Sequence, residues 1–207
     1  MPQPATPIAA ASLILLRDGA AGLEVLMTQR RPDASFAAGA LVFPGGKVDP
    51  GDGDVPAQAL RAAAVREAIE ECGIRVDHQA LVPFAHWITP ADRPKRFDTW
   101  FFAARTPQDQ IAKASPDEVT ELVCTTPALL LAGAAAGHHS LVLATHMNLL
   151  KLCRWNTVDE ALAAAAAATI VAVTPEWQDT PDGQVIHIPE AADYGVTHVP
   201  AGIVRRA

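Results

Sequence analysis

Hydrophobic positions in the first half of the chain form short runs that are separated by polar turns. The runs at 8–18 and 23–30 flank a Gly-Ala-Ala-Gly turn and predict a two-stranded hairpin. The segment 45–54 is dense in Gly and Asp and predicts a loop. Further strands are predicted at 41–44, 81–89, 97–105, 118–126 and 184–189.

Helical patterns begin after this loop. A helix is predicted at 56–72, with Asp54 as its N-cap, Pro56 in the first turn and Gly73 at its end. The Ala- and Leu-rich segment 127–170 is helical in character, and we expect it to wall a pocket or to form a dimer contact. The tail after residue 189 is predicted to be irregular.

The order of these elements favours an α+β fold in which helices sandwich a mixed sheet. A length of 207 residues suits one domain. We expect its core at about 8–126 and a helical extension and tail at about 127–207.

Charge and cysteine content narrow the class of protein. A net charge of -7 argues against binding to nucleic acid through overall charge. Cys72, Cys124 and Cys153 form no CxxC pair, which favours a reduced cytoplasmic protein over a disulfide framework or a zinc site. The first apolar run is broken by Arg17 and Asp18, so it predicts a strand rather than a signal peptide, and no membrane partner is expected.

Three glutamates crowd near the end of the predicted helix. Glu67, Glu70 and Glu71 fall on one side of it. The opposite side is apolar, with Val65, Ala68, Ile69 and Cys72. A solvated acidic face is one interpretation, but like charges at this spacing repel, and the helix dipole disfavours anions in the last turn. We therefore expect a hard cation, Mg²⁺ or Mn²⁺, which could neutralise a diphosphate and activate water for attack on phosphorus.

The stretch REAIEECGI, residues 66–74, resembles the second half of the Nudix box. Upstream, GGKVDPGD resembles the first half, with Gly46 and Asp52 at its glycine and acidic positions. About six extra residues separate the two halves here, so whether Asp52 reaches a metal stays open. The resemblance implies a Nudix hydrolase with an α/β/α sandwich.

The same resemblance implies roles for individual residues. Glu67, Glu70 and Glu71 would bind the metal, with the carbonyl of Gly46 as a weaker candidate, and Arg66 would orient the glutamates. Glu67 and Glu70 also count as candidate catalytic residues. A further glutamate, Glu118 or Glu121, would act as base or ligand, and the sequence does not choose between them.

The segment 26–46 resembles the motif of coenzyme A diphosphatases, although Ser35 stands where a second arginine is expected. With the enlarged box, it is also similar to the long-box branch of Nudix proteins related to peroxisomal acyl-CoA diphosphatases. This implies CoA or acyl-CoA as substrate. ADP-ribose, dinucleotides and a non-catalytic nucleotide-binding regulator are the alternatives. The candidate substrate-binding residues are Arg30, Arg31, Gly45 and Arg96, with Arg93 and Lys95 as further cations.

The histidines are weaker candidates. The alternating pattern around His86 and Trp87 predicts that one of them lies in the core and the other at the rim. His138, His139 and His146 are too few and too widely spaced to predict a zinc site. A homodimer is possible, and a small nucleotide diphosphate is the expected partner.

Overall fold

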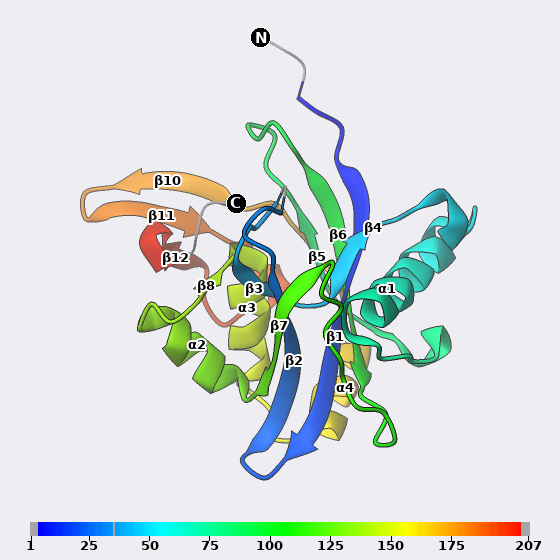
Figure 1. The fold of residues 1–207 in the computed structure, drawn as a ribbon. Coiled ribbons are helices and arrows are strands. Elements are labelled where there is room, and N and C mark those ends of the chain that lie inside the picture. Colours follow the sequence, from blue (N-terminus) through cyan, green and yellow to red (C-terminus); the bar gives the residue numbers. More distant parts are fainter. Residues whose placement is uncertain (1–3, 35, 204–207) are drawn as a thin grey trace.

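The structure, a computed structural model, describes residues 4–34 and 36–203. Strands β1 (Ile8–Gly19) and β2 (Gly22–Arg30) form the predicted hairpin, closed at Gly19 and Gly22. The other edge of β1, at residues 8–16, pairs in parallel with the whole of β6 (Phe97–Arg105). Because β1 has partners on both edges and burial on both faces, it forms the centre of the molecule (Figure 1).

The described strands around β1 form a mixed sheet, with the order β8-β3-β2-β1-β6-β5-β9. Strand β4 also pairs with β1, and β7 pairs with β2. The remaining bounds in this sheet are β3 (Ala40–Val42), β4 (Gly45–Lys47), β5 (Val82–Ile88), β7 (Val119–Thr125), β8 (Ser140–Leu141) and β9 (Ala172–Val173).

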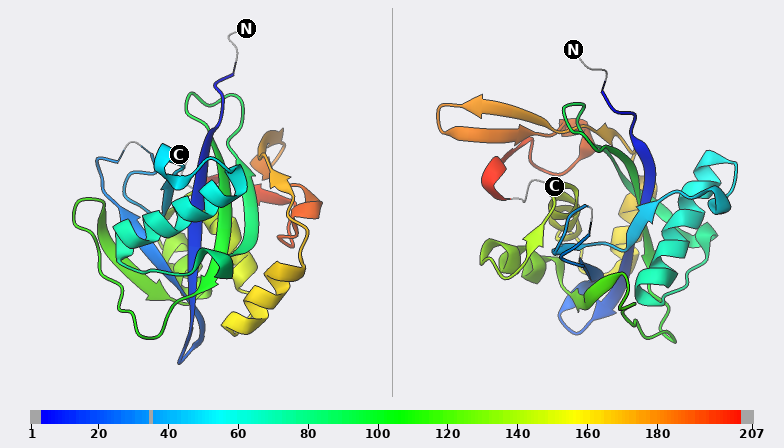
Figure 2. Two further views of the ribbon diagram at one scale, coloured as in Figure 1. Left: turned by 90° about the vertical axis from the view of Figure 1, so that its right-hand side faces the viewer. Right: turned by 45° about the horizontal axis from the view of Figure 1, so that its top comes forward.

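Helices cover both faces of the sheet (Figures 1 and 2). Side chains of β1 alternate between the faces. Leu13 and Leu15 pack with helix α1 (Pro56–Cys72) in one core, whereas Ile14 and Leu16 lie in a second core on the opposite face. The second core includes buried residues of α2 (Pro127–Ala135), α3 (Leu143–Leu152) and α4 (Val158–Ala167). The predicted α+β sandwich with a mixed sheet is confirmed.

The bounds of α1 agree with the prediction, but its N-cap does not. Pro56 opens the helix and Gly73, with a φ of +69°, ends it in the left-handed conformation that glycine favours. The N-cap is Val55, whose side chain makes no capping bond, and not Asp54. Pro56 explains the difference, because it fixes the first helical φ and places the cap directly before itself.

Two predictions of irregular structure are wrong. The predicted loop at 45–54 contains β4, because residues 45–47 pair with residues 10–12 of β1. The predicted irregular tail contains β12 (His198–Pro200), which joins β10 (Glu176–Thr180) and β11 (Gly183–His187) in a second antiparallel sheet. Four short 3-10 helices complete the described structure: η1 (Pro50–Asp52), η2 (His78–Ala80), η3 (Glu190–Ala192) and η4 (Ala201–Ile203).

Among the described helices, none combines the length and the apolar character that a membrane span requires.

Trp87 is buried in the core and His86 is partly exposed, as the alternating pattern predicted. His86 is hydrogen-bonded to Asp98 and stacked on Trp100.

Candidate metal and diphosphate site

Glu71, in the last turn of α1, is a buried carboxylate. Its side chain is 4% exposed. One of its oxygens, Oε2, accepts hydrogen bonds from the hydroxyl of Thr28 and the backbone N–H of Gly45, both at 3.3 Å. The other, Oε1, lies 3.7 Å from a guanidinium nitrogen of Arg30. The sequence predicted that this carboxylate would project with Glu67 and Glu70 toward a cation, but it did not predict the burial. It is buried because β2 and β4 meet the end of α1.

Glu67 lies one turn earlier and is held on two sides. Its carboxylate accepts a hydrogen bond from Arg66 at 2.8 Å. On the other side it rests against the backbone of β4, since a Cβ atom at Gly46 would lie only 2.2 Å from Glu67 Oε1. Gly46 is therefore required sterically if Glu67 is to occupy this place.

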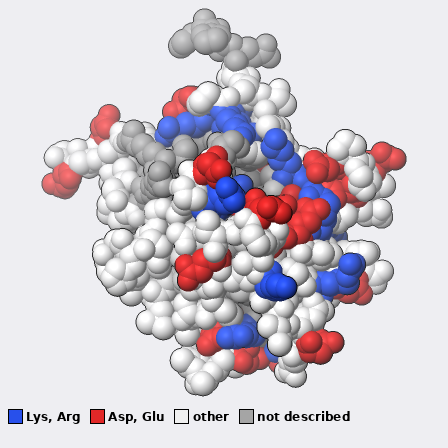
Figure 3. All heavy atoms as spheres, viewed as in Figure 1, with Lys and Arg blue, Asp and Glu red and all other residues white. Residues whose placement is uncertain are grey.

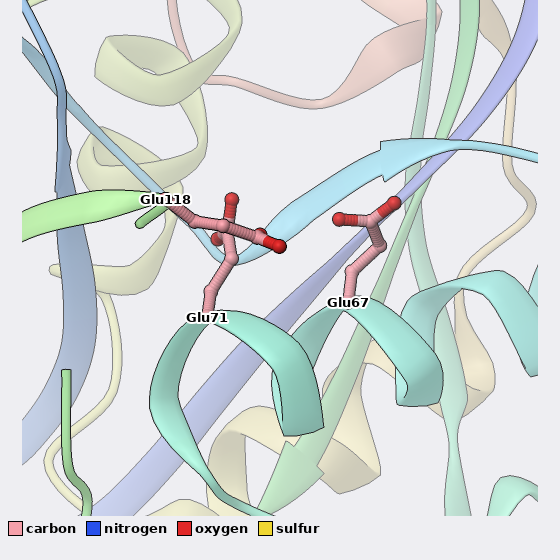
Figure 4. Close-up of side chains that lie close together, drawn as sticks. All are labelled: Glu67, Glu71 and Glu118. Carbon is pink, nitrogen blue, oxygen red and sulfur yellow. The ribbon is translucent and has the colours of Figure 1, made fainter. Parts of the chain in front are cut away.

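Glu118 brings a third carboxylate from a distant part of the chain. It lies in the turn just before β7, and single oxygens of Glu67, Glu71 and Glu118 all lie within 4.8 Å of one another. In Figure 4, Glu118 reaches toward Glu71 from one side, and Glu67 stands on the preceding turn of α1. Glu121 is exposed on β7, opposite Gln29, and is not part of this group. The structure thus separates two residues that the sequence left as equals.

Glu70 occupies a different place from the one predicted. Its side chain is 43% exposed, and its carboxylate accepts a hydrogen bond from Arg66 at 2.9 Å instead of joining the group of three glutamates. Glu70 and Glu71 are neighbours in sequence and lie about 100° apart around the helix, so that Glu70 faces solvent when Glu71 is buried against β2 and β4.

Arg66 connects helix α1 to the enlarged loop that precedes it. It binds both oxygens of Asp52 at 3.0 Å and the carbonyl of Lys47 at 2.9 Å, besides its bonds to Glu67 and Glu70. These contacts raise the pKa of Arg66 and lower the pKa of Asp52. Asp52 is thus engaged by Arg66 and is not part of the carboxylate group formed with Glu118.

Burial shapes the electrostatics of the group. Burial, opposed by the positive charge of Arg30 and reinforced by the charge of Glu67, raises the pKa of Glu71 from 4.5 to about 7. Burial is also the main cause that raises the pKa of Glu67, where Arg66 acts in the opposite direction. Carboxylates held this close without a cation repel one another.

The donor set fits a divalent metal. Three carboxylates from two separate parts of the chain converge, and two of them are shielded from water. Among the described residues, Arg30 and Arg66 form the ion pairs that offset the charge of Glu71 and Glu67. Oxygen ligands of this kind suit Mg²⁺ or Mn²⁺. Glu67, Glu71 and Glu118 would hold such an ion.

The carboxylate group opens into a cleft of about 480 Å³. Acidic and basic side chains gather beside one another on this face (Figure 3). The predicted residues Arg30, Arg31, Gly45 and Gly46 line the cleft, together with Lys47, Asp33, Ala34, Asp49, Glu67, Glu71, Asp117 and Glu118. Arg30 carries a buried Nε that has no hydrogen-bond partner among the described residues.

The other predicted cations differ in their availability. Arg31 is held by Asp33 and by the carbonyl of Pro116. Arg96 donates to the carbonyls of Thr89 and Ala5 and lines neither this cleft nor the groove described below, so the structure does not bring it to the site. Ser35 lies outside the described residues.

Thr28 is a site residue that sequence reasoning missed. It is fully buried and donates to Glu71, and the residue pattern of a strand alone does not reveal such a partner. Among the described residues, the group that could hold a metal ion consists of Glu67, Glu71 and Glu118 and includes no histidine.

Comparison with known proteins decides the family. A model of the NUDIX domain matches residues 6–145. The chain belongs to the NUDIX domain family. The resemblance of residues 66–74 to the Nudix box is thereby confirmed, and the family supports a hydrolase that acts on phosphorus-containing anhydrides. The match does not distinguish the long-box CoA diphosphatase branch from other NUDIX proteins.

Several solved NUDIX structures share the fold. A NUDIX hydrolase from Alicyclobacillus acidocaldarius has a TM-score of 0.71 and 22% identity, over 79% of this chain and 99% of that one. A MutT NUDIX hydrolase from Burkholderia pseudomallei has a TM-score of 0.52 and 20% identity, over 70% and 97%. The NUDIX domain of Shewanella oneidensis NrtR, complexed with ADP-ribose, has a TM-score of 0.54 and 16% identity, over 72% and 88%. No curated protein sequence matched the chain.

Proposed function

We propose that this NUDIX protein is a divalent-metal-dependent hydrolase that cleaves the P–O–P linkage of a nucleoside diphosphate joined to a second moiety. The observation that carries the proposal is the convergence of Glu67, Glu71 and Glu118 beside Arg30, at one cleft. A diphosphate is the anion that such a combination of metal-binding carboxylates and arginine can hold.

The residues of the chain divide the work. A bound Mg²⁺ or Mn²⁺ would neutralise charge on the diphosphate and favour attack by water. Arg30 would meet a phosphate oxygen, Arg66 holds Glu67 and Glu70 in place, and Gly45 fixes Glu71 through its N–H. Glu118, exposed at the edge of the group, would complete the metal site or accept the proton of the attacking water. Glu70 and the carbonyl of Gly46 stay candidate ligands.

CoA or acyl-CoA is the substrate that we favour, on the resemblance of residues 26–46 to the CoA diphosphatase motif and on the cations near the cleft. Hydrolysis would release adenosine 3′,5′-bisphosphate and a 4′-phosphopantetheine product. ADP-ribose and dinucleotides form the second candidate class of substrates. The complex of the NrtR NUDIX domain with ADP-ribose supports this second class.

The test is hydrolysis of a panel that contains CoA, an acyl-CoA, ADP-ribose and dinucleotides, with Mg²⁺ or Mn²⁺ and with chelator. Mass spectrometry of the products identifies both the substrate and the cleaved bond. We expect metal-dependent cleavage between the two phosphorus atoms. If no diphosphate is turned over, the enzyme proposal fails and a non-catalytic nucleotide-binding regulator takes its place. If CoA esters are inert while ADP-ribose is cleaved, only the substrate proposal fails.

A cytoplasmic location, a homodimer and the division into a core at 8–126 and an extension at 127–207 stay predictions of the sequence.

A further inference from the structure

A second, larger groove continues from the metal cleft. Its volume is about 730 Å³, against about 480 Å³ for the cleft. The two share Arg30, Ala34 and the β4 residues Gly45, Gly46 and Lys47 along their common boundary. A substrate whose diphosphate lies at the carboxylate group can therefore extend into this groove without a break.

The walls of the groove are aromatic. Phe36 and Phe97 pack edge to face, with ring centroids 5.0 Å apart. Trp177 and Phe101 are further aromatic residues of the lining, and Ile88 lines the groove as well. Surfaces of this kind bind flat or apolar bodies such as a nucleoside base.

The charged side chains that line the groove are all positive. Its described lining residues include no Asp or Glu but four cations, Arg30, Lys47, Arg93 and Lys95. The metal cleft, in contrast, is lined by six acidic residues. Arg93 and Lys95 line the groove but not the metal cleft, and both sit over aromatic rings. Arg93 lies 5.0 Å from the ring centroid of Trp177, and Lys95 lies 5.5 Å from that of Phe97.

The partner ring of Arg93 comes from a part of the chain outside the family match. Trp177 lies on β10, beyond residue 145, where the NUDIX match ends. Arg93 lies in the turn between β5 and β6, and its Nε lies 3.8 Å from the carboxylate of the exposed Asp92. Trp177 orients the Arg93 guanidinium by stacking, so the second sheet supplies part of the groove.

We propose that this groove binds the nucleoside arm of the substrate and that this arm carries a phosphate separate from the diphosphate, which Arg93 recognises. The inference rests on the proposed function of the adjoining metal cleft. A purely apolar arm would cover the partly exposed Arg93 guanidinium without offering it an anion, and removing a charge from water in this way is unfavourable. A base with an additional phosphate satisfies both the aromatic walls and the cations. Arg93 is thus a specificity-determining residue, and Trp177 is its positioning residue.

The experiment uses substrate pairs that differ only in the separate phosphate: CoA with dephospho-CoA, and NADPH with NADH. In the wild-type protein we expect kcat/KM to favour the phosphorylated member of at least one pair by about ten- to a hundredfold, the range of a charge-assisted contact. Arg93→Gln should bring that ratio close to one, mainly through a lower kcat/KM for the phosphorylated member. Trp177→Phe should keep most of the preference, and Trp177→Leu should reduce it. Arg75→Gln, which changes an arginine outside both cavities, is the matched control and should behave as wild type.

A binding measurement keeps the inference testable if no diphosphate is hydrolysed. Calorimetry with adenosine 3′,5′-bisphosphate and with AMP should give tighter binding of the bisphosphate to the wild type and equal binding to Arg93→Gln. Equal ratios in wild type and Arg93→Gln, or no preference of the wild type in any pair, would overturn the inference. Loss of all turnover with the binding preference intact would instead refute only the proposed hydrolase.

Discussion

At the scale of single residues, Glu71 combines burial with a charge that the site requires. Its raised pKa of about 7 means that the folded protein without metal disfavours the ionised form. In the unfolded chain the same group titrates near 4.5. Between these values the folded state binds more protons than the unfolded state, so Glu71 lowers the free energy of unfolding progressively as pH rises toward about 7 and fully above it.

Glu71→Gln should remove this penalty. In chelator at about pH 8 we expect the variant to be more stable than wild type by about 3 kcal/mol, and near pH 4 the two should be equal. Denaturant unfolding at several pH values measures this. A variant that is less stable than wild type at pH 8 would show that the hydrogen bonds of Glu71 outweigh its burial.

Glu118 and Glu121 provide a matched pair on either side of the start of β7. Of these two residues, Glu118 alone joins the carboxylate group. Glu118→Gln should therefore lower the affinity for Mn²⁺ and lower kcat/KM by about tenfold or more, while Glu121→Gln should stay near wild type. Turnover measured as a function of Mn²⁺ concentration separates the two roles of Glu118. A lower kcat with unchanged Mn²⁺ affinity would assign it to proton transfer instead of metal binding, and equal losses in both variants would contradict the geometry.

At the scale of elements, the contact between β4 and α1 positions the metal ligands. Gly46→Ala would drive a methyl group into the carboxylate of Glu67, so we expect kcat/KM to fall by about tenfold or more. Gly51→Ala is the control, since a Cβ there meets nothing within 4 Å, and it should leave activity unchanged. Similar rates for both variants would mean that the approach of β4 to α1 is not needed.

The enlarged loop before α1 is tied down by Asp52 through Arg66. Because Asp52 touches Arg66 and not the carboxylate group, Asp52→Asn should reduce kcat/KM much less than Glu67→Gln. Steady-state kinetics of the two variants compares them. Equal losses would indicate that Asp52 reaches the metal during the reaction.

At the scale of the whole molecule, local sequence signals predicted the parts that depend on local physics. Pro56 and Gly73 marked the ends of α1 because their backbone preferences are intrinsic. The metal helix was found from the spacing of its glutamates. The burial of Glu71 could not be predicted, since it depends on β2 and β4 crossing the end of the helix.

Long-range packing also decided what the sequence left open or missed. Glu118 was separated from Glu121 only by the register of β7 against β2. The strand β10, with the polar sequence EWQDT, has no apolar pattern that would predict it, and so the role of Trp177 in the groove was hidden. The charge of Arg96 made it a candidate phosphate ligand. In the structure its guanidinium donates hydrogen bonds to the backbone carbonyls of Thr89 and Ala5 instead.

The central claim is that carboxylates from α1 and from the turn before β7 form one divalent-metal site. Calorimetric titration of Mn²⁺ into the wild-type protein and into Glu67→Gln, Glu71→Gln, Glu118→Gln and Glu121→Gln tests it most directly. We predict saturable binding to the wild type and to Glu121→Gln, and binding weakened by about tenfold or more in Glu67→Gln, Glu71→Gln and Glu118→Gln. The same Mn²⁺ affinity in all five proteins would contradict the claim.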